Sequence, residues 1–166
     1  MSADKEEERR TIIGLEPIIT KDTRVLILGS FPSVISLEQK QYYANPRNIF
    51  WKIIKSTFNR AAGSYDECIA LLKQHQVGLW DIYHDCERKG SLDSDIKNGK
   101  KNDFESLKRI APSLKRICLN GMKAGSHSDM FRKLGYETLV LPSTSPANAA
   151  MPYAQKERLW DNALAR

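Results

Sequence analysis

The feature that most constrains the fold is a short apolar run, Val25-Leu26-Ile27-Leu28, which stops abruptly at Gly29. An uninterrupted apolar run of this length is typical of a strand that is buried on both faces of a parallel sheet. Ligands of such sheets bind at the carboxyl ends of the strands. We therefore expect the segment that follows this strand, residues 29–51, to line the functional cleft.

Three more segments resemble the first strand, and helical patterns separate them. The predicted strands are residues 24–28, 77–83, 115–120 and 136–141, and the predicted helices are residues 48–58, 64–74, 103–110, 123–134 and 155–166. Residues 29–47 and 84–102 are predicted to be long loops. The alternation predicts an α/β fold with three layers, in which a four-stranded parallel sheet lies between helices.

Capping residues define where several of these helices are expected to begin and end. Asn45, which precedes a proline, is predicted to cap the first helix. Ser64 is predicted to cap the second, with Glu67 completing a capping box. Asp103 is predicted to cap the third, and Gly135 to end the fourth.

The length of 166 residues suits one domain, which we assign to residues 14–166 after a charged tail at residues 1–13. The formal net charge is +6. An excess of positive charge favours a polyanionic partner, of which nucleic acid is the commonest, although an ordinary basic protein is the alternative.

Cysteine usage and hydropathy indicate the compartment. The chain has an odd number of widely spaced cysteines, which favours reduced thiols in the cytoplasm over a disulfide framework: Cys68, Cys86 and Cys118. No apolar run approaches the roughly 20 residues of a membrane span. No set of four ligands suggests a metal site or an iron–sulfur cluster, so we expect no metal and no cofactor.

Several motifs occur in an order that resembles a known family. They are Gly29-Ser30-Phe31-Pro32, residues 42–51 (YYANPRNIFW), residues 78–81 (GLWD), residues 86–93 (CERKGSLD), residues 119–121 (LNG) and residues 141–148 (LPSTSPAN). Together they resemble the uracil-DNA glycosylase superfamily and, more narrowly, its hypoxanthine-DNA glycosylase branch. The resemblance extends from about residue 14 to the C-terminus.

The resemblance implies a monomeric enzyme that acts on DNA containing a deaminated base. The implied reaction is hydrolysis of the N-glycosidic bond of hypoxanthine, which leaves an abasic site. It implies a cytoplasmic protein, associated with the nucleoid if the source is a prokaryote. Phe31 stands where the uracil enzymes carry Asp or Asn, a departure shared with the hypoxanthine branch. Ser33 and Leu119 stand where that branch is expected to carry Gly and Phe.

The chemistry requires a flipped nucleotide and a positioned water near an oxocarbenium-like sugar. The resemblance implies that Asn48 is the catalytic polar residue; the alternative is a residue at a helix start that bonds only to backbone. Ser30 and the backbone after Gly29 are expected to meet the base or the water. Asp81 ends a predicted strand, where it would either activate water or cap a helix.

Three residues are predicted to hold the base, with Gly29 close by. Phe50 resembles the stacking aromatic of the family and is predicted to stack on the base; the alternative is a core residue that packs with Ile53 and Ile54. Phe31 is expected to close the other side of the base pocket. Asn120 ends a predicted strand and could donate to O6 or N7 of hypoxanthine; the alternative is a turn residue before a glycine.

The loop after the last strand is predicted to contact DNA. Hydroxyl groups and backbone N–H groups suit contacts with phosphates, which we assign to Ser143, Thr144 and Ser145. Pro146 and Asn148 belong to a small segment that could enter the base stack as a wedge. Arg47 is a predicted phosphate contact. The alternative for the loop is an ordinary turn.

Two other functions stay open at this point. The enzyme could act on uracil, xanthine or a mismatched pyrimidine, although Phe31 argues against efficient removal of uracil. The chain could also be a non-catalytic module that binds nucleic acid on the same fold, because a fold alone does not determine function. Replacing Asn48 by alanine separates these classes. A binding module would keep its only activity, affinity for DNA, whereas an enzyme would lose turnover and keep much of its binding.

Overall fold

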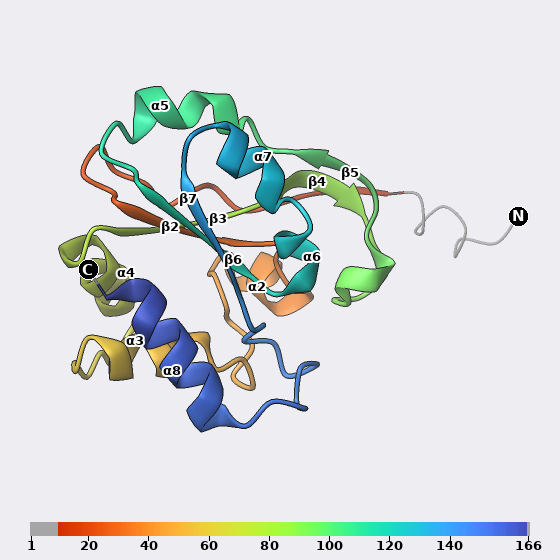
Figure 1. Cartoon of the computed structure of the whole chain (residues 1–166). Helices are drawn as coiled ribbons and strands as arrows, with labels where there is room; N and C mark the ends of the chain where they lie inside the picture. The colour runs from red at the N-terminus through yellow and green to blue at the C-terminus, as the bar shows by residue number, and fades with distance from the viewer. Residues whose placement is uncertain (1–9, 166) are drawn as a thin grey trace, which may run out of the picture.

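A parallel four-stranded sheet in the order β3-β2-β6-β7 forms the centre of the computed structural model, which describes residues 10–165 (Figure 1). Its strands are β2 (Val25–Gly29), β3 (Val77–Asp81), β6 (Arg116–Asn120) and β7 (Glu137–Leu141). Gly29 pairs with Asp81 in the register, and Asn120 pairs with Leu141. The carboxyl ends of these strands therefore share one edge of the sheet, as the sequence predicts.

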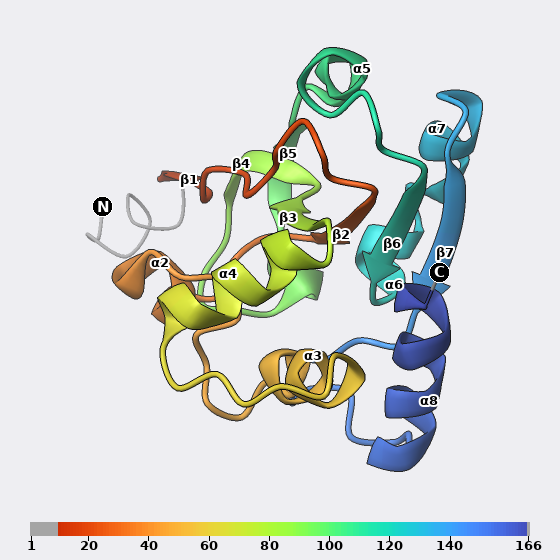
Figure 2. The ribbon, with the colours of Figure 1, turned by 90° about the vertical axis from the view of Figure 1, so that its left-hand side faces the viewer.

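Helices cover both faces of this sheet. One face carries α3 (Phe50–Thr57), α4 (Tyr65–Gln74) and α8 (Tyr153–Leu164), and the other carries α5 (Leu107–Ile110), α6 (Met122–Gly125) and α7 (Ser128–Lys133). Figures 1 and 2 show α3 and α8 next to each other on the first face. The three-layer α/β/α architecture is confirmed.

The strands are buried because their side chains alternate between two apolar cores. Leu26 and Leu28 of β2 pack into the core beneath α5 and α7, whereas Ile27 packs into the core beneath α3, α4 and α8. All three side chains have an exposed fraction of 0%. Burial on both faces explains why the strand sequence is continuously apolar and does not alternate with polar residues.

A second, antiparallel sheet lies where the sequence predicts a loop and a tail. Its order is β1-β4-β5, from β1 (Thr11–Ile13), β4 (Tyr83–Glu87) and β5 (Lys97–Lys101). The predicted loop over 84–102 is therefore wrong, and so is the tail at its last residues, 11–13; residues 1–9 of that tail lie outside the described part of the chain. The predicted strand over 77–83 divides at Ile82 into β3 and β4. Short 3₁₀ turns at Asp93–Asp95 and Phe104–Ser106 flank β5.

The predicted loop over 29–47 contains a short helix, α2 (Val34–Gln39). Ser33 caps it, because the Ser33 Oγ accepts a hydrogen bond from the backbone N–H of Ser36 at 3.2 Å. Lys40 ends it in a left-handed conformation with a φ of 54°. The helix has only six residues, which is too short for a helical period to be recognised in the sequence.

Other helix ends differ from the prediction in informative ways. The first predicted helix begins at Phe50, because Asn45 forms a turn with Arg47 (Asn45 Oδ1 accepts from Arg47 N at 3.0 Å) and does not cap the helix. Ser64 does cap α4, with Ser64 Oγ accepting from Glu67 N at 3.1 Å. Asp103 makes no capping hydrogen bond.

The predicted helix over 123–134 is divided into α6 and α7, and Gly135 follows it with a φ of 97°. Within residues 10–165, no helix is long and apolar enough to cross a membrane. The cysteines are buried and form no disulfide, in agreement with the predicted reduced thiols.

Candidate active site

Polar side chains gather where the parallel strands end. We call this group the strand-end cluster and define it as Gly29, Tyr43, Asp81, Asn120 and Thr144. The Asn120 Nδ2 donates to the Tyr43 hydroxyl at 3.2 Å and to the Thr144 Oγ1 at 3.0 Å. The Thr144 backbone N–H donates back to Asn120 Oδ1 at 3.0 Å. Asn120 therefore joins the segment before α3 to the loop after β7.

Tyr43 is the aromatic side chain best placed to receive a base. Its ring stacks on Phe50, with centroids 4.0 Å apart and 27° between the planes. Phe50 itself has an exposed fraction of 0%, whereas Tyr43 is partly exposed. In this conformation no base can stack directly on Phe50, because Tyr43 covers it. The packing of Phe50 matches the alternative reading, a core residue.

The backbone at Tyr43 has a φ of 55°, which is unusual for an aromatic residue. Residues in such conformations often belong to functional sites. The sequence contains the signal, a pair of tyrosines before the Asn-Pro-Arg-Asn segment, but it does not tell which aromatic faces the sheet edge. The prediction therefore missed Tyr43.

Asp81 is a buried carboxyl group at the last position of β3. Its exposed fraction is 5%, and its Oδ2 has no hydrogen-bond partner. The pKa of Asp81 is raised to about 7, mainly by burial and also by the neighbouring Asp93, whereas Arg88 acts in the opposite direction. β4 begins two residues later, so the alternative role as a helix cap is wrong.

Gly29 makes room for this carboxyl group. A Cβ atom at Gly29 would lie 2.7 Å from the Asp81 Oδ1 and 3.2 Å from the Tyr43 hydroxyl. Any side chain at position 29 would therefore displace one of these two groups. The Gly29 carbonyl accepts a hydrogen bond from Ile82 N at 2.8 Å.

The loop after β2 is held by the segment 88–93. The Ser30 Oγ donates to Asp93 Oδ2 at 3.2 Å. The Arg88 guanidinium lies 5.1 Å from the centre of the Phe31 ring and donates to the Pro32 carbonyl. This segment lies within the CERKGSLD motif, residues 86–93.

Phe31 packs in the core beneath α5 and α7, together with Leu26 and Leu28. Phe50 and the partly buried Tyr43 belong to the core on the opposite face of the sheet. The structure therefore does not bring Phe31 and Phe50 together as the two sides of one pocket.

Asn48 lies at the entry to α3 and is half-buried. Its Oδ1 accepts a hydrogen bond from the Phe50 backbone N–H at 2.9 Å. This bond fits the alternative to a catalytic role, a residue at a helix start that bonds to backbone. Its Nδ2 makes no hydrogen bond with any residue between 10 and 165. The amide nitrogen is thus the part of the side chain that remains for a substrate.

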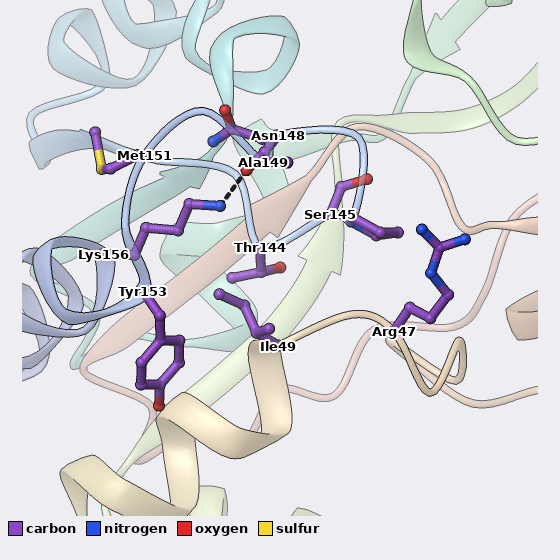
Figure 3. Close-up of a pocket in the computed structure, with 10 residues that line it drawn as sticks. Arg47, Ile49, Thr144, Ser145, Asn148, Ala149, Met151, Tyr153 and Lys156 are labelled. Atoms are coloured by element: carbon purple, nitrogen blue, oxygen red, sulfur yellow. Dashed lines mark hydrogen bonds between the residues drawn. The ribbon is translucent and has the colours of Figure 1, made fainter.

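A second region, which we call the loop pocket, adjoins the strand-end cluster (Figure 3). It has a volume of about 180 Å³ and is lined by Arg47, Ile49, Thr144, Ser145, Pro146, Asn148, Ala149, Met151, Tyr153 and Lys156. Five of the six residues predicted to contact DNA line it, the exception being Ser143. The predicted catalytic and base-binding residues do not line it.

Lys156 is a member of the loop pocket that the sequence did not suggest. Its exposed fraction is 5%, and its Nζ donates to the carbonyl of Asn148, as the dashed line in Figure 3 marks. Ser143 supports the same loop from within: its Oγ accepts from Ser145 N at 3.1 Å, and its carbonyl accepts from Asn148 Nδ2 at 3.2 Å. A lysine in the first turn of a helix gives no sequence signal for such a role.

Comparisons with known proteins agree with this geometry. A family model described as the uracil DNA glycosylase superfamily matches residues 16–164. The chain belongs to the uracil-DNA glycosylase superfamily. Within residues 10–165, no group of three or more His, Cys, Asp or Glu side chains could hold a metal ion.

Two named relatives and one solved structure are similar over nearly the whole chain. A Hypoxanthine DNA glycosylase of Methanosarcina acetivorans is 42% identical over 150 residues, which cover 89% of this chain and 94% of the relative. One of Methanosarcina barkeri is 37% identical over 155 residues, covering 92% and 98%. A solution NMR structure of a Methanosarcina acetivorans protein assigned to the uracil DNA glycosylases superposes with a TM-score of 0.85 at 38% identity, covering 93% and 97%.

Proposed function

We propose that this chain is a monofunctional DNA glycosylase that removes hypoxanthine from DNA by hydrolysis of the N-glycosidic bond. The observation that carries the proposal is near full-length similarity to two proteins named Hypoxanthine DNA glycosylase, at 42% and 37% identity. The strand-end cluster offers the polar and aromatic groups that such a reaction needs. The catalytic unit is a single domain that includes β1 (Thr11–Ile13) and acts as a monomer.

In this proposal the flipped base stacks on the outer face of Tyr43. Phe50 supports the tyrosine ring from behind, so that Phe50 acts through Tyr43 and not by direct contact. A stacked base contributes about 1–3 kcal/mol. The Asn120 amide, now shared between Tyr43 and Thr144, donates to O6 or N7 of the base.

Asn48 acts on the sugar side of the base. Its Oδ1 is engaged with the Phe50 backbone, so its Nδ2 is the group that orients the attacking water or a substrate oxygen. An amide is a weak base, and the rate enhancement therefore comes from positioning and electrostatic stabilisation. Ser30 and the backbone around Gly29 complete the water site.

The loop pocket holds the DNA backbone. Arg47 and the Ser145 hydroxyl contact phosphates beside the flipped nucleotide. Thr144, whose exposed fraction is 1% and whose Oγ1 accepts from Asn120, is too buried for the predicted phosphate contact and instead orders the loop together with Ser143. Pro146 and Asn148 fill the space that the flipped base leaves in the stack. The buried Lys156 adds positive charge behind this loop.

The test is an assay of strand scission. End-labelled duplexes, each with a single hypoxanthine, uracil, xanthine or adenine, are incubated with the protein, and abasic sites are then cleaved with hot alkali. Scission is expected at hypoxanthine and not at adenine. The Asn48→Ala variant, run in parallel, is expected to bind the hypoxanthine duplex and to cut it poorly.

Other results would change the proposal. Scission mainly at uracil or xanthine would retain the glycosylase and reject the hypoxanthine assignment. No scission at any base, with intact affinity for the duplexes, would reject the enzyme in favour of a binding module. An Asn48→Ala variant as active as the parent would reject the catalytic role of Asn48.

A further inference from the structure

Asp81 is a buried carboxyl group to which the mechanism above gives no task. Its exposed fraction is 5%, and its Oδ2 has no hydrogen-bond partner. Burying a carboxylate without partners costs free energy, and proteins avoid it unless the group is neutral or functional. A carboxyl group retained in this state therefore points to chemistry.

The position of Asp81 connects it with the base platform. Gly29 and Asp81 are paired residues at the ends of neighbouring strands. The Asp81 Oδ1 and the Tyr43 hydroxyl both lie within contact distance of one point above Gly29, at 2.7 Å and 3.2 Å from the position of a Cβ atom. The hydroxyl end of Tyr43 therefore lies beside the Asp81 carboxyl group. In the proposed complex, we expect the edge of a base stacked on Tyr43 to face this carboxyl group.

The charges around Asp81 keep it ready to give up a proton. Burial is the main cause that raises its pKa to about 7; Asp93 acts in the same direction, and Arg88 opposes it. A group with a pKa near the working pH is suited to general acid catalysis. Tyr43 cannot replace it, because burial raises the pKa of the phenol above its ordinary value and the phenol keeps its proton.

We propose that the protonated carboxyl group of Asp81 is a general acid that protonates the leaving purine; the inference rests on the proposed function. As the bond between C1′ and N9 breaks, its electron pair moves into the purine ring, and the Asp81 proton is transferred to N7. Neutral hypoxanthine leaves. Water adds to C1′ and releases its proton to solvent, and the Asp81 carboxylate takes a proton back from solvent. A pyrimidine has no ring nitrogen equivalent to N7.

The decisive experiment compares two bases and two proteins. Single-turnover rates are measured for the parent and Asp81→Asn on duplexes with hypoxanthine or with 7-deazahypoxanthine, in which a C–H group replaces N7. On hypoxanthine, Asp81→Asn is expected to be slower by about 10²–10⁴-fold, the usual contribution of a general acid. On 7-deazahypoxanthine, the parent is expected to be slow and the two proteins to differ little.

The pH profile provides a second readout that a structural role would not change. The parental rate on hypoxanthine is expected to fall tenfold for each pH unit above the pKa of Asp81, and the Asp81→Asn rate to lack this fall. Asp93→Asn removes a negative charge that raises this pKa, so the fall is expected to begin at a lower pH. Thermal unfolding of each variant identifies any that does not fold.

Three results would overturn the inference. They are an Asp81→Asn variant that loses the same factor on both bases, a parent that cuts both bases equally fast, and a pH profile that neither substitution changes. Failure of the proposed function gives a different result: the parent would then release no hypoxanthine at any pH, and the role of Asp81 would be rejected together with it.

Discussion

The strand-end cluster and the loop pocket are neighbours, but they differ in burial, charge and attachment. The cluster combines buried groups at strand ends, such as Asp81 and Asn120, with Tyr43 and Thr144 from the adjoining loops. The loop pocket is lined by small polar residues, by apolar and aromatic residues, and by two cations, Arg47 and Lys156. The main-chain hydrogen bond from Ile49 N to the Thr144 carbonyl, 3.1 Å, joins the two regions.

The difference suggests a division of labour. A buried, pre-ordered cluster stabilises a transition state, because its groups need no reorganisation during the reaction. A basic, open pocket contributes affinity through phosphate contacts, which depend on salt. Substitutions in the cluster are therefore expected to change the rate, and substitutions in the loop pocket to change binding.

After Asp81→Asn, the largest effect on the rate is expected at Asn48, which lies at the entry to α3. Asn48→Ala should lower the single-turnover rate on a hypoxanthine duplex by about 10²–10³-fold, because the positioned amide is lost. Its affinity for the duplex should change little. Asn48→Asp retains an oxygen that can accept from Phe50 N but lacks the Nδ2 donor. A slow Asn48→Asp variant that unfolds at the parental temperature would show that the lost amide group, and not the lost hydrogen bond to Phe50 N, causes the defect. A loss in affinity equal to the loss in rate would contradict the division.

The next effect concerns stability and its dependence on pH. The pKa of Asp81 is raised to about 7 in the folded protein, so the folded state holds a proton that the unfolded state releases. Stability should therefore decrease as the pH rises from about 4 to about 7. Between pH 5 and pH 8 this group should cost about 2–3 kcal/mol of unfolding free energy.

Asp81→Asn should remove that part of the pH dependence and make the protein more stable than the parent at pH 8. Urea unfolding of both proteins at pH 5 and pH 8 measures the difference. Asp66→Asn, at an exposed position in the first turn of α4, is the matched control. Equal pH dependence in the parent and Asp81→Asn would show that Asp81 titrates normally.

A smaller effect is expected at Tyr43. Tyr43→Ala should weaken binding of a duplex with a non-cleavable 2′-fluoro hypoxanthine nucleotide by about 1–3 kcal/mol, because the stacking face is lost. Tyr43→Phe keeps the ring and should retain most of that affinity. An undamaged duplex tests specificity, since both variants should bind it like the parent. If Tyr43→Ala binds the flipped-base analogue as well as the parent, the platform lies elsewhere.

The smallest effect is expected in the loop pocket. Arg47→Ala should reduce the slope of log affinity against log salt by about 1, because one phosphate contact is lost. Arg109→Ala, an exposed arginine on α5 at the other face of the sheet, should leave the slope unchanged. Titrations at several salt concentrations measure both. A loss confined to the cleavage step would place Arg47 in the chemistry and contradict the division.

Sequence patterns predicted the parallel sheet but not the antiparallel one, for a physical reason. β2 is apolar because it is buried on both faces, and that pattern is independent of its partners. β5, Lys97-Asn98-Gly99-Lys100-Lys101, is exposed along its whole length and is a strand only because it pairs with β4. Its side chains contain no sign of that pairing.

Like the fold, the candidate site was predicted only in part from the sequence. Motif resemblance pointed to segments that the fold brings together, and five of the six predicted DNA contacts line one pocket. It did not indicate which aromatic of residues 42–51 faces the sheet edge. That depends on a left-handed backbone at Tyr43, which local sequence does not encode at an aromatic residue.

By itself the sequence determined that four strands end at one edge, because each apolar run is stopped by a glycine, a proline or a polar residue at its carboxyl end. It also determined which loops meet there, because parallel strands bring those ends together. Only the tertiary structure decided which groups are buried without partners and which rings are covered. Asp81 becomes a proton donor candidate, and Phe50 a support for Tyr43, through packing between segments far apart in the chain.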